Sequence, residues 1–173
     1  MIALGLGSNL GNRAENIMNA LNCLCANYPI TLLQVSSLYE TAPVGFLNQP
    51  SFLNAVAEIQ TLLDPLSLLE ACLQTEKLLG RIRDIKWGPR SIDIDLLLYH
   101  AIRLESEALT LPHPFLHERR FVLEPLLEIA QDAMLVDGQT AAQMLTQLED
   151  KAEVKFYGKL LLQGGKVQLD ETD

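Results

Sequence analysis

The spacing of apolar residues in the first part of the chain predicts a buried strand followed by an amphipathic helix. Residues 1–7 are nearly all apolar and end in glycine, which is typical of a strand inside a sheet. Ile17, Leu21 and Leu24 then recur at helical spacing, and Pro29 ends the run. We therefore expect a helix of about four turns after the strand.

Two further strands separated by a loop are predicted next. The stretch 31–39 is rich in Leu, Val and Ser, and 52–59 is apolar at most positions, so each is interpreted as one strand. Between them, 41–50 is interrupted by proline and glycine and is expected to be a loop. Such a short connection favours antiparallel pairing of the two strands.

A second helix, a loop and a fourth strand are expected after that. Asp64 followed by Pro65 is a favourable helix start, and Gly80 marks the end of the helix. Residues 81–90 are expected to form a loop and 91–99 a strand. The apolar stripe expected along this helix consists of Leu66, Leu69, Cys72 and Leu73.

The last third of the chain is predicted to contain two helices and a terminal hairpin. Residues 103–111 are expected to form a short excursion of the chain after the fourth strand. Helices are expected over 120–130 and 140–148. Near the end, a Gly-Gly step at 164–165 separates two strand-like runs and is typical of a hairpin turn.

The predicted order strand–helix–strand–strand–helix–strand is that of the split βαβ, ferredoxin-like fold. We therefore expect an α+β protein with a central, mainly antiparallel sheet flanked by helices, followed by a C-terminal helix and hairpin. A length of 173 residues fits a single domain over 1–173. The tail 151–173 has no assigned role beyond folding, although its hairpin could extend the sheet or mediate self-association.

Composition changes this picture mainly by excluding partners. The formal net charge of −9 argues against a nucleic-acid partner, because phosphate backbones are bound by clustered cations. No apolar run approaches the roughly 18 residues of a membrane span, and the first residues lack the features of a secretory signal. We therefore expect a cytoplasmic protein without a membrane partner. The cysteines are interpreted as core thiols: Cys23, Cys25 and Cys72.

The strongest chemical signal is a pair of aspartates in the otherwise apolar fourth strand. Side chains alternate along a strand, so Asp93 and Asp95 are expected to share one face. The residues expected to face the core are Ile92, Ile94, Leu96 and Leu98. Two adjacent carboxylates repel each other and lose solvation, so a cation should compensate them. With water and phosphate oxygens they would form a typical Mg²⁺ site, and the alternative is a solvated strand face with two acids.

Cations gather just before this strand. Four of the chain's thirteen lysines and arginines lie on the ten-residue loop there: Arg81, Arg83, Lys86 and Arg90. A metal-bound polyphosphate needs metal for some oxygens and arginines for others, so the loop and the aspartates together favour polyphosphate binding over a merely solvated loop. Trp87 on the same loop is compatible with a nucleobase wall or with a loop anchor.

Two further motifs leave alternatives open. The glycines within 5–11 have the spacing GxGxxxG, which is neither the dinucleotide-binding fingerprint nor a P-loop. A structural strand-to-helix turn is therefore the preferred interpretation. His113 lies in a stiff Pro-His-Pro segment upstream of Arg119, where a structural role and a phosphate-contacting role are equally compatible with the sequence.

Together these motifs resemble those of the 6-hydroxymethyl-7,8-dihydropterin pyrophosphokinase family. The resemblance runs in order from residue 3 to about residue 138 and is most specific over 81–95. It rests on the segments 5–11, 39–45, 49–54, 79–83, 87–90, 92–98 and 111–114. The resemblance implies a folate-pathway reaction in which ATP gives its β,γ-pyrophosphoryl group to the pterin hydroxymethyl oxygen and AMP is released.

The resemblance also implies roles for individual residues. Asp93 and Asp95 are implied to hold two Mg²⁺ ions, and the loops 41–50 and 81–90 are implied to close over the site. The implied catalytic residues are Arg81, Arg83 and Arg90. The implied ATP-binding residues are Glu76, Trp87, His113 and Arg119. The implied pterin-binding residues are Thr41, Ala42, Val44, Phe52, Asn54 and Phe121, with the two phenylalanines sandwiching the ring.

Some positions depart from the family pattern, and other classes of protein remain as alternatives. Leu73 stands where some members carry Gln, Pro114 where some carry an aromatic residue, and Asp84 where a basic residue can occur. A palm-like nucleotidyl transferase should carry a basic surface, and a non-catalytic ferredoxin-like module should bind its ligand without Mg²⁺. The expected partners are ATP and the pterin, bound by a monomer or a weak homodimer.

Overall fold

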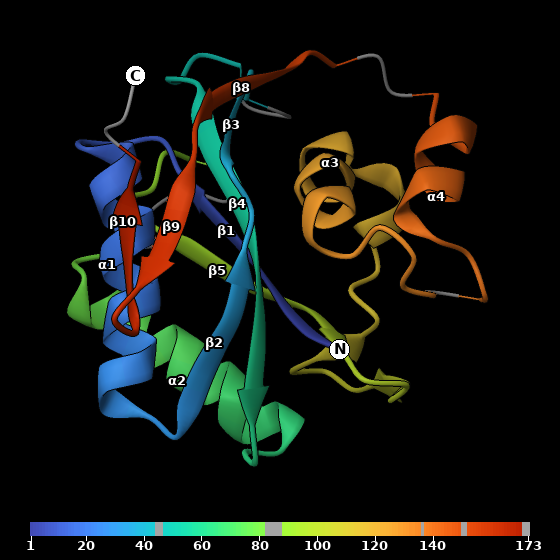
Figure 1. Ribbon diagram of the computed structural model, residues 1–173, viewed down its shortest axis with the longest axis horizontal. Helices are drawn as coiled ribbons and strands as arrows, with labels where there is room; N and C mark the ends of the chain where they lie inside the picture. Colours follow the sequence, from blue (N-terminus) through green and yellow to red (C-terminus); the bar gives the residue numbers. More distant parts are fainter. Residues whose placement is uncertain (44–46, 82–87, 136, 150–151, 171–173) are drawn as a thin grey trace.

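The computed structural model of the chain describes residues 1–43, 47–81, 88–135, 137–149 and 152–170, and a six-stranded sheet forms its centre (Figure 1). The first half contains β1 (Ile2–Ser8), α1 (Arg13–Asn27), β2 (Ile30–Val35), β3 (Leu38–Thr41), β4 (Phe52–Thr61), α2 (Pro65–Leu78) and β5 (Asp93–Tyr99). The second half contains β6 (Leu104–Glu105), β7 (Thr110–Leu111), a 3-10 turn (Leu116–Glu118), α3 (Arg120–Ile129), α4 (Ala141–Gln147), β8 (Val154–Gly158), β9 (Leu160–Gln163) and β10 (Lys166–Leu169).

The central sheet has the strand order β5–β1–β4–β3–β8, and β2 pairs with another part of β4. Each pairing described within it is antiparallel. The α+β, split βαβ prediction is therefore confirmed. Across the sheet, Gly7 of β1 lies between Asn54 of β4 and Asp93 of β5, so one end of the sheet collects residues that are far apart in the sequence.

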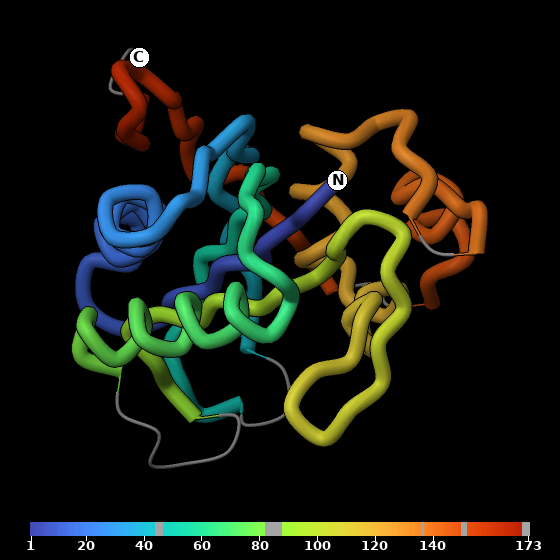
Figure 2. Tube along the Cα trace, turned by 90° about the horizontal axis from the view of Figure 1, so that it is seen from below, coloured from blue at the N-terminus to red at the C-terminus, as the bar shows by residue number. Residues whose placement is uncertain are grey.

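Helices cover both faces of the sheet (Figure 1). α1 and α2 lie on one face, and Figure 2 views α1 nearly end-on with α2 running across beside it. The core beneath them includes Leu4, Ile17, Leu21, Ile59 and Leu68. The core beneath α3 and α4, on the other face, includes Ala3, Val56, Leu97, Leu123 and Met144. None of the described helices combines the length and the apolar character needed to cross a membrane.

The single strand expected over 31–39 is instead two strands, β2 and β3, separated by Ser36 and Ser37. Both serines are buried. The Ser36 hydroxyl accepts the N–H of Val56 at 2.9 Å, and the Glu128 carboxylate accepts the N–H and the hydroxyl of Ser37 at 2.8 and 2.9 Å. These side-chain hydrogen bonds replace part of the backbone hydrogen bonding between strands. The chain can therefore bend at the two serines while β2 and β3 both pair with β4.

The fourth predicted strand is β5, but its alternation breaks after Leu96. Leu4 of β1 pairs with Leu96, and the next pair is Ala3 with Leu98. Leu97 is therefore an extra residue, a β-bulge. As a result Leu98 packs with Ala3 beneath α3 and α4, while Leu96 packs beneath α1 and α2. The prediction that these two leucines share a face is wrong.

α2 begins where predicted, but of the expected stripe only Cys72 is among its buried residues, and Leu69 is partly buried against the core. The Asp64 side chain caps it by accepting the N–H groups of Leu66 and Ser67. Leu66, which was expected in the stripe, is half exposed. The buried residues of the helix are Leu68, Ala71, Cys72, Thr75 and Glu76. The polar residues Thr75 and Glu76 make this stripe hard to recognise from apolar periodicity alone.

The C-terminal hairpin forms as predicted, but it does not extend the sheet. β9 and β10 form a separate two-stranded sheet beside α1 (Figure 1). There the Asn22 side chain donates to the carbonyl of Val167 at 3.1 Å and accepts its N–H at 2.8 Å. The central sheet is extended instead by β8, which pairs with β3 and which the sequence did not predict.

Candidate active site

A cavity of about 680 Å³ lies on the α3 face of the sheet, where β1, β4 and β5 meet the segment that leads into α3. Most of the expected site residues line it: Thr41, Ala42, Phe52, Asn54, Arg81, Arg90, Asp93, Asp95, His113, Arg119 and Phe121. Val44, Arg83 and Trp87 lie outside the described residues. Glu76 lies behind β5, on the buried face of α2.

Two glycines of β1 lie opposite the aspartates of β5 and line the cavity. A Cβ on Gly5 would come within 3.3 Å of the Leu97 methyl groups, and a Cβ on Gly7 within 3.3 Å of Asn54 Oδ1. These glycines therefore allow a close approach to the backbone at this point. The motif was interpreted only as a strand-to-helix turn, a role for which Gly11, with φ +63°, suffices.

Three arginines surround the two aspartates. Arg81 Nη1 is 2.5 Å from Asp93 Oδ1, and Arg90 Nη1 is 2.9 Å from Asp93 Oδ2. Arg119 Nη1 is 3.6 Å from Asp95 Oδ2. Guanidinium groups bind phosphate oxygens through paired donors, and carboxylates bind metal ions. The cluster therefore combines the two kinds of group that a metal-bound polyphosphate requires.

The charge of Asp95 is unfavourable in this cavity. Burial and the neighbouring Asp93 carboxylate raise the pKa of Asp95 to about 6, although Arg119 and Arg90 act in the opposite direction. Mg²⁺ is commonly held by one or two protein carboxylates, with water and substrate phosphates as its other ligands. The described residues contain no group of three or more potential metal ligands. Asp93 and Asp95 supply two such carboxylates in one cavity, so they fit Mg²⁺ that binds together with a polyphosphate.

Glu76 supports the site from behind. Its side chain is buried, and its Oε1 accepts the N–H of Ile94 at 2.8 Å. The same oxygen is 2.5 Å from Arg81 Nη1. Because Ile94 stands between Asp93 and Asp95, this carboxylate links α2 both to the backbone of the aspartate strand and to one arginine. Glu76 thus holds other site residues in place and is not among the described residues that line the cavity.

His113 is held in one orientation and one tautomer. Its backbone N–H donates to the carbonyl of Leu97 at 2.8 Å, and its Nδ1 accepts the N–H of Phe115 at 3.2 Å. Burial and the positive charge of Arg119 lower the pKa of His113 to about 4. The neutral ring therefore carries its proton on Nε2, where it can be donated to an anionic ligand.

We expect the His113 ring to stay neutral well below pH 6. In a ¹⁵N NMR titration the midpoint for the His113 ring should lie at about pH 4, whereas that of an ordinary histidine lies at about pH 6.5. Because the folded-state pKa is lowered, the stability that the group contributes is present above pH 6.5 and is lost as the pH falls towards about 4. The acid loss of stability should be smaller in His113→Gln. A midpoint near pH 6.5 would contradict this description of the site.

The rings of Phe52 and Phe121 line the cavity, each close to an arginine. The guanidinium carbon of Arg90 is 5.5 Å from the ring centre of Phe52, on β4. The guanidinium carbon of Arg119 is 5.7 Å from the ring centre of Phe121, on α3. Flat apolar faces next to cations can accept a planar, electron-rich heterocycle by stacking.

A buried polar pair lies in the same cavity. The Asn54 amide donates to the Thr41 hydroxyl oxygen at 2.8 Å, and both side chains are more than nine-tenths buried. Buried amide and hydroxyl groups of this kind give a pocket its hydrogen-bonding specificity, because a ligand that leaves them unsatisfied binds poorly.

Among the lining residues that the sequence interpretation missed are an aromatic and an acidic one. Phe115 and Glu118 contribute to the cavity between His113 and Arg119. A lone phenylalanine or a lone glutamate after a Pro-His-Pro segment carries no recognisable signal in a single sequence. Phe115 immediately precedes the 3-10 turn Leu116–Glu118 and Glu118 is its last residue.

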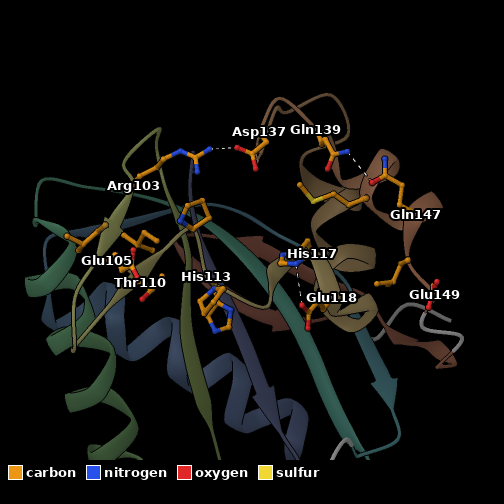
Figure 3. A pocket seen from close by; sticks show the side chains of 16 residues that line it. Arg103, Glu105, Thr110, His113, His117, Glu118, Asp137, Gln139, Gln147 and Glu149 are labelled. Carbon is orange, nitrogen blue, oxygen red and sulfur yellow. Dashed lines mark hydrogen bonds and ion pairs between the residues drawn. The ribbon is translucent and has the colours of Figure 1, made fainter.

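A larger cavity, of about 930 Å³, lies between the β6–β7 hairpin and α4 (Figure 3). An ion pair between Arg103 and Asp137 and a 3.2 Å hydrogen bond from Gln139 to Gln147 cross its rim. Among the described residues that line it, one is an arginine, Arg103, and four are acidic: Glu105, Glu118, Asp137 and Glu149. This excess of carboxylates repels a polyphosphate, so the smaller cavity is the candidate active site.

Comparisons with known proteins show the family of the chain. The profile of the family 7,8-dihydro-6-hydroxymethylpterin-pyrophosphokinase (HPPK) matches residues 3–131. A 2-amino-4-hydroxy-6-hydroxymethyldihydropteridine pyrophosphokinase of Bacillus subtilis is 47% identical over 128 residues, which are 74% of this chain and 77% of that protein. The protein of the same name from Methylorubrum extorquens is 46% identical over 146 residues, 84% of this chain and 92% of that protein.

The fold is also found in solved structures. The crystal structure of Plasmodium falciparum HPPK-DHPS matches with a TM-score of 0.63 and 16% identity, over 97% of this chain. The chain spans 48% of the length of that protein, and at this identity the likeness concerns the fold alone. The family profile covers about three quarters of the chain, and the two relatives named above share nearly half of the aligned residues with it. The chain therefore belongs to the 7,8-dihydro-6-hydroxymethylpterin-pyrophosphokinase family.

Proposed function

We propose that the smaller cavity binds ATP and 6-hydroxymethyl-7,8-dihydropterin next to each other and transfers pyrophosphate between them. The observation that carries this proposal is the convergence of the Asp93 and Asp95 carboxylates, the described arginines and the rings of Phe52 and Phe121 in one cavity. The arginines are Arg81, Arg90 and Arg119. The chain is a pyrophosphokinase of folate biosynthesis, with ATP as co-substrate. In the reaction, the pterin hydroxymethyl oxygen forms a bond to the β-phosphorus of ATP, the bond from that phosphorus to the α,β-bridging oxygen breaks, and AMP leaves.

Asp93 and Asp95 would hold Mg²⁺, and we propose two ions. When bound, Mg²⁺ would neutralise phosphate oxygens and help to align ATP with the attacking hydroxyl. The raised pKa of Asp95 supports this assignment, because a carboxylate that is poorly stabilised by the protein gains from a bound cation.

Arg81, Arg90, Arg119 and His113 would bind the triphosphate. Each arginine lies within 3.6 Å of one of the aspartates, and the His113 ring can donate from Nε2. Phosphoryl-group transfer needs little covalent chemistry from the protein, so these residues would act by positioning the phosphates and by stabilising charge as it moves to the leaving oxygen. Glu76 would contribute at the edge of the ATP site by holding Arg81.

The pterin would lie between Phe52 and Phe121, with its polar edge towards Asn54, Thr41, Ala42 and Val44. The buried hydrogen bond from Asn54 to Thr41 supports this orientation, because it presents amide and hydroxyl groups to a heterocycle. Arg83 and Trp87 belong to the loop over 81–90, which we propose to close over the site and exclude water.

Replacement of Asn54 by leucine tests whether the pterin binds in this cavity. Leucine has nearly the same shape but cannot form hydrogen bonds, so the pterin edge should be left unsatisfied. We expect the KM for the pterin to rise by about 10²-fold, with the KM for ATP within about twofold of the wild type. Steady-state assays that vary each substrate separately measure both constants. An unchanged KM for the pterin would place the pterin elsewhere.

We also propose, from the sequence, the domain organisation, the oligomeric state and the location of the protein. They are a single domain over 1–173, a monomer or weak homodimer, and a cytoplasmic location. β8 gives the tail a structural role in such a domain, because it pairs with β3 at the edge of the central sheet.

A further inference from the structure

Phe115 is a large apolar residue that is placed in the cavity wall and not in a core. It belongs to neither described core cluster, and 44% of its surface is exposed. It immediately precedes the 3-10 turn Leu116–Glu118. The partners of its ring must therefore be sought among the residues of the active site.

The ring of Phe115 contacts one of the proposed triphosphate-binding residues. The guanidinium carbon of Arg119 is 5.2 Å from the ring centre of Phe115 and 5.7 Å from that of Phe121, so two aromatic rings flank this cation. The Arg119 side chain is only 18% exposed, and its Nη1 is 3.6 Å from Asp95 Oδ2. Attraction between a guanidinium and a ring face is stronger where water is excluded, and the arginine of this pair is mostly buried.

Phe115 also contacts the second residue proposed to bind the triphosphate in this segment. Its backbone N–H donates to His113 Nδ1 at 3.2 Å. Its ring centre is 6.1 Å from that of His113, and the two ring planes are inclined by 55°. Phe115 thus contacts both residues. Its ring and its main chain contact His113, and its ring contacts Arg119.

We propose that Phe115 is a positioning residue for pyrophosphate transfer: its ring holds the Arg119 guanidinium beside Asp95, and its N–H sets the tautomer of His113. The proposal rests on the proposed roles of Arg119 and His113 in binding ATP. The long arginine side chain has many rotamers, and a ring that confines it lowers the entropy lost when it binds phosphate.

Two substitutions separate the ring face from the rest of Phe115. Phe115→Leu keeps apolar bulk and the backbone N–H but removes the ring, whereas Phe115→Tyr keeps the ring. We expect kcat/KM for ATP to fall by about tenfold in Phe115→Leu and to stay within about twofold of the wild type in Phe115→Tyr. The KM for the pterin should change little in both. Phe156→Leu, which alters an exposed ring on β8 outside the cavity, is the matched control and should behave like the wild type.

Two further measurements show whether Phe115 acts through Arg119. In an Arg119→Ala background, Phe115→Leu should have almost no additional effect on kcat/KM, because the side chain that it positions is already absent. In NMR spectra of the ligand-free protein, the Arg119 Nε–H proton should be shifted upfield by the two rings. This shift should become smaller in Phe115→Leu and should persist in Phe115→Tyr.

The outcomes distinguish this inference from the proposed function. Wild-type ATP kinetics in Phe115→Leu, or a full effect of Phe115→Leu in the Arg119→Ala background, would overturn the positioning role while Arg119 keeps its own. An unshifted Arg119 Nε–H resonance in the wild-type protein would overturn it without any variant. Wild-type ATP kinetics in Arg119→Ala would overturn the proposed function of Arg119 and, with it, this inference.

Discussion

Asp95→Ala should lower kcat by about 10³-fold or more while the protein stays folded. Asp95 and Asp93 share one strand face, so removal of one carboxylate leaves an incomplete ligand set for Mg²⁺ beside the arginines. The side chain belongs to no described core cluster. It lines the cavity and keeps 40% of its surface open there, although the surrounding protein desolvates it enough to raise its pKa, so its loss creates no closed void. The measurement is kcat at saturating ATP, pterin and Mg²⁺, together with a thermal melting curve.

The controls for Asp95→Ala separate a metal ligand from a general change of charge. Asp132→Ala, at an exposed position outside the cavity, removes the same charge and should keep wild-type turnover. Chelation of divalent ions should stop the wild-type enzyme, and added Mg²⁺ should restore it. Near-wild-type kcat in a folded Asp95→Ala enzyme would falsify the metal assignment.

The same carboxylate should lower the stability of the ligand-free protein at neutral pH. The folded-state pKa of Asp95 is raised to about 6, so above that pH the carboxylate is ionised in the folded protein at a cost in folding free energy. This loss of stability is absent below pH 3.8, the ordinary pKa of an aspartate. It develops as the pH rises from there to about 6 and is complete above that pH. Asp95→Asn should therefore melt about 2–4 °C higher than the wild type at pH 7.5, a modest gain because solvent screens a partly open side chain. The difference should disappear at pH 4.

Arg90→Ala should lower kcat by about 10²–10³-fold, the second largest effect that we expect. Arg90 is 2.9 Å from Asp93 and also lies over the Phe52 ring, so it stands where the two substrates would meet. In the part of the chain that the structure describes, its buried Nε has no hydrogen-bond partner. A phosphate oxygen would supply one, and a guanidinium placed in this way stabilises charge on the transferred group.

Single-turnover rates under saturating substrates measure the effect of Arg90→Ala on the chemical step. Arg103→Ala is the matched control, because Arg103 pairs with Asp137 at the rim of the other cavity and should be dispensable for turnover. A rise in the KM for ATP with kcat unchanged would mean that Arg90 binds the ground state and the transition state equally, which contradicts a catalytic role.

The fold was predictable from sequence wherever local signals agreed with tertiary packing. The Asp64 and Pro65 start of α2 is an example, because capping and backbone geometry are encoded within a few residues. The division between β2 and β3 was not predictable, because the partner that satisfies Ser37 is Glu128, 91 positions away. The bulge at Leu97 has the same explanation, since its register is set by β1 and not by the residues of β5.

The site was predictable where residue type and spacing together imply chemistry. Asp93 and Asp95 stood out because a period of two places both carboxylates on one face of an apolar strand. Gly5 and Gly7 were interpreted too narrowly, because a glycine leaves no side chain to suggest what approaches it. Phe115 was missed because its importance depends on Arg119 and His113 lying beside it in space. The implied roles of individual residues remain predictions until the variants are measured.

The central claim is the transfer of pyrophosphate from ATP to the pterin, and product analysis tests it most directly. Purified protein is incubated with ATP, Mg²⁺ and 6-hydroxymethyl-7,8-dihydropterin, and the nucleotides and pterins are separated by chromatography. We predict AMP and the pterin diphosphate ester in equal amounts, with product formation dependent on both the pterin and Mg²⁺. Formation of ADP with a pterin monophosphate, or no turnover by the folded protein supplied with Mg²⁺, would contradict the claim.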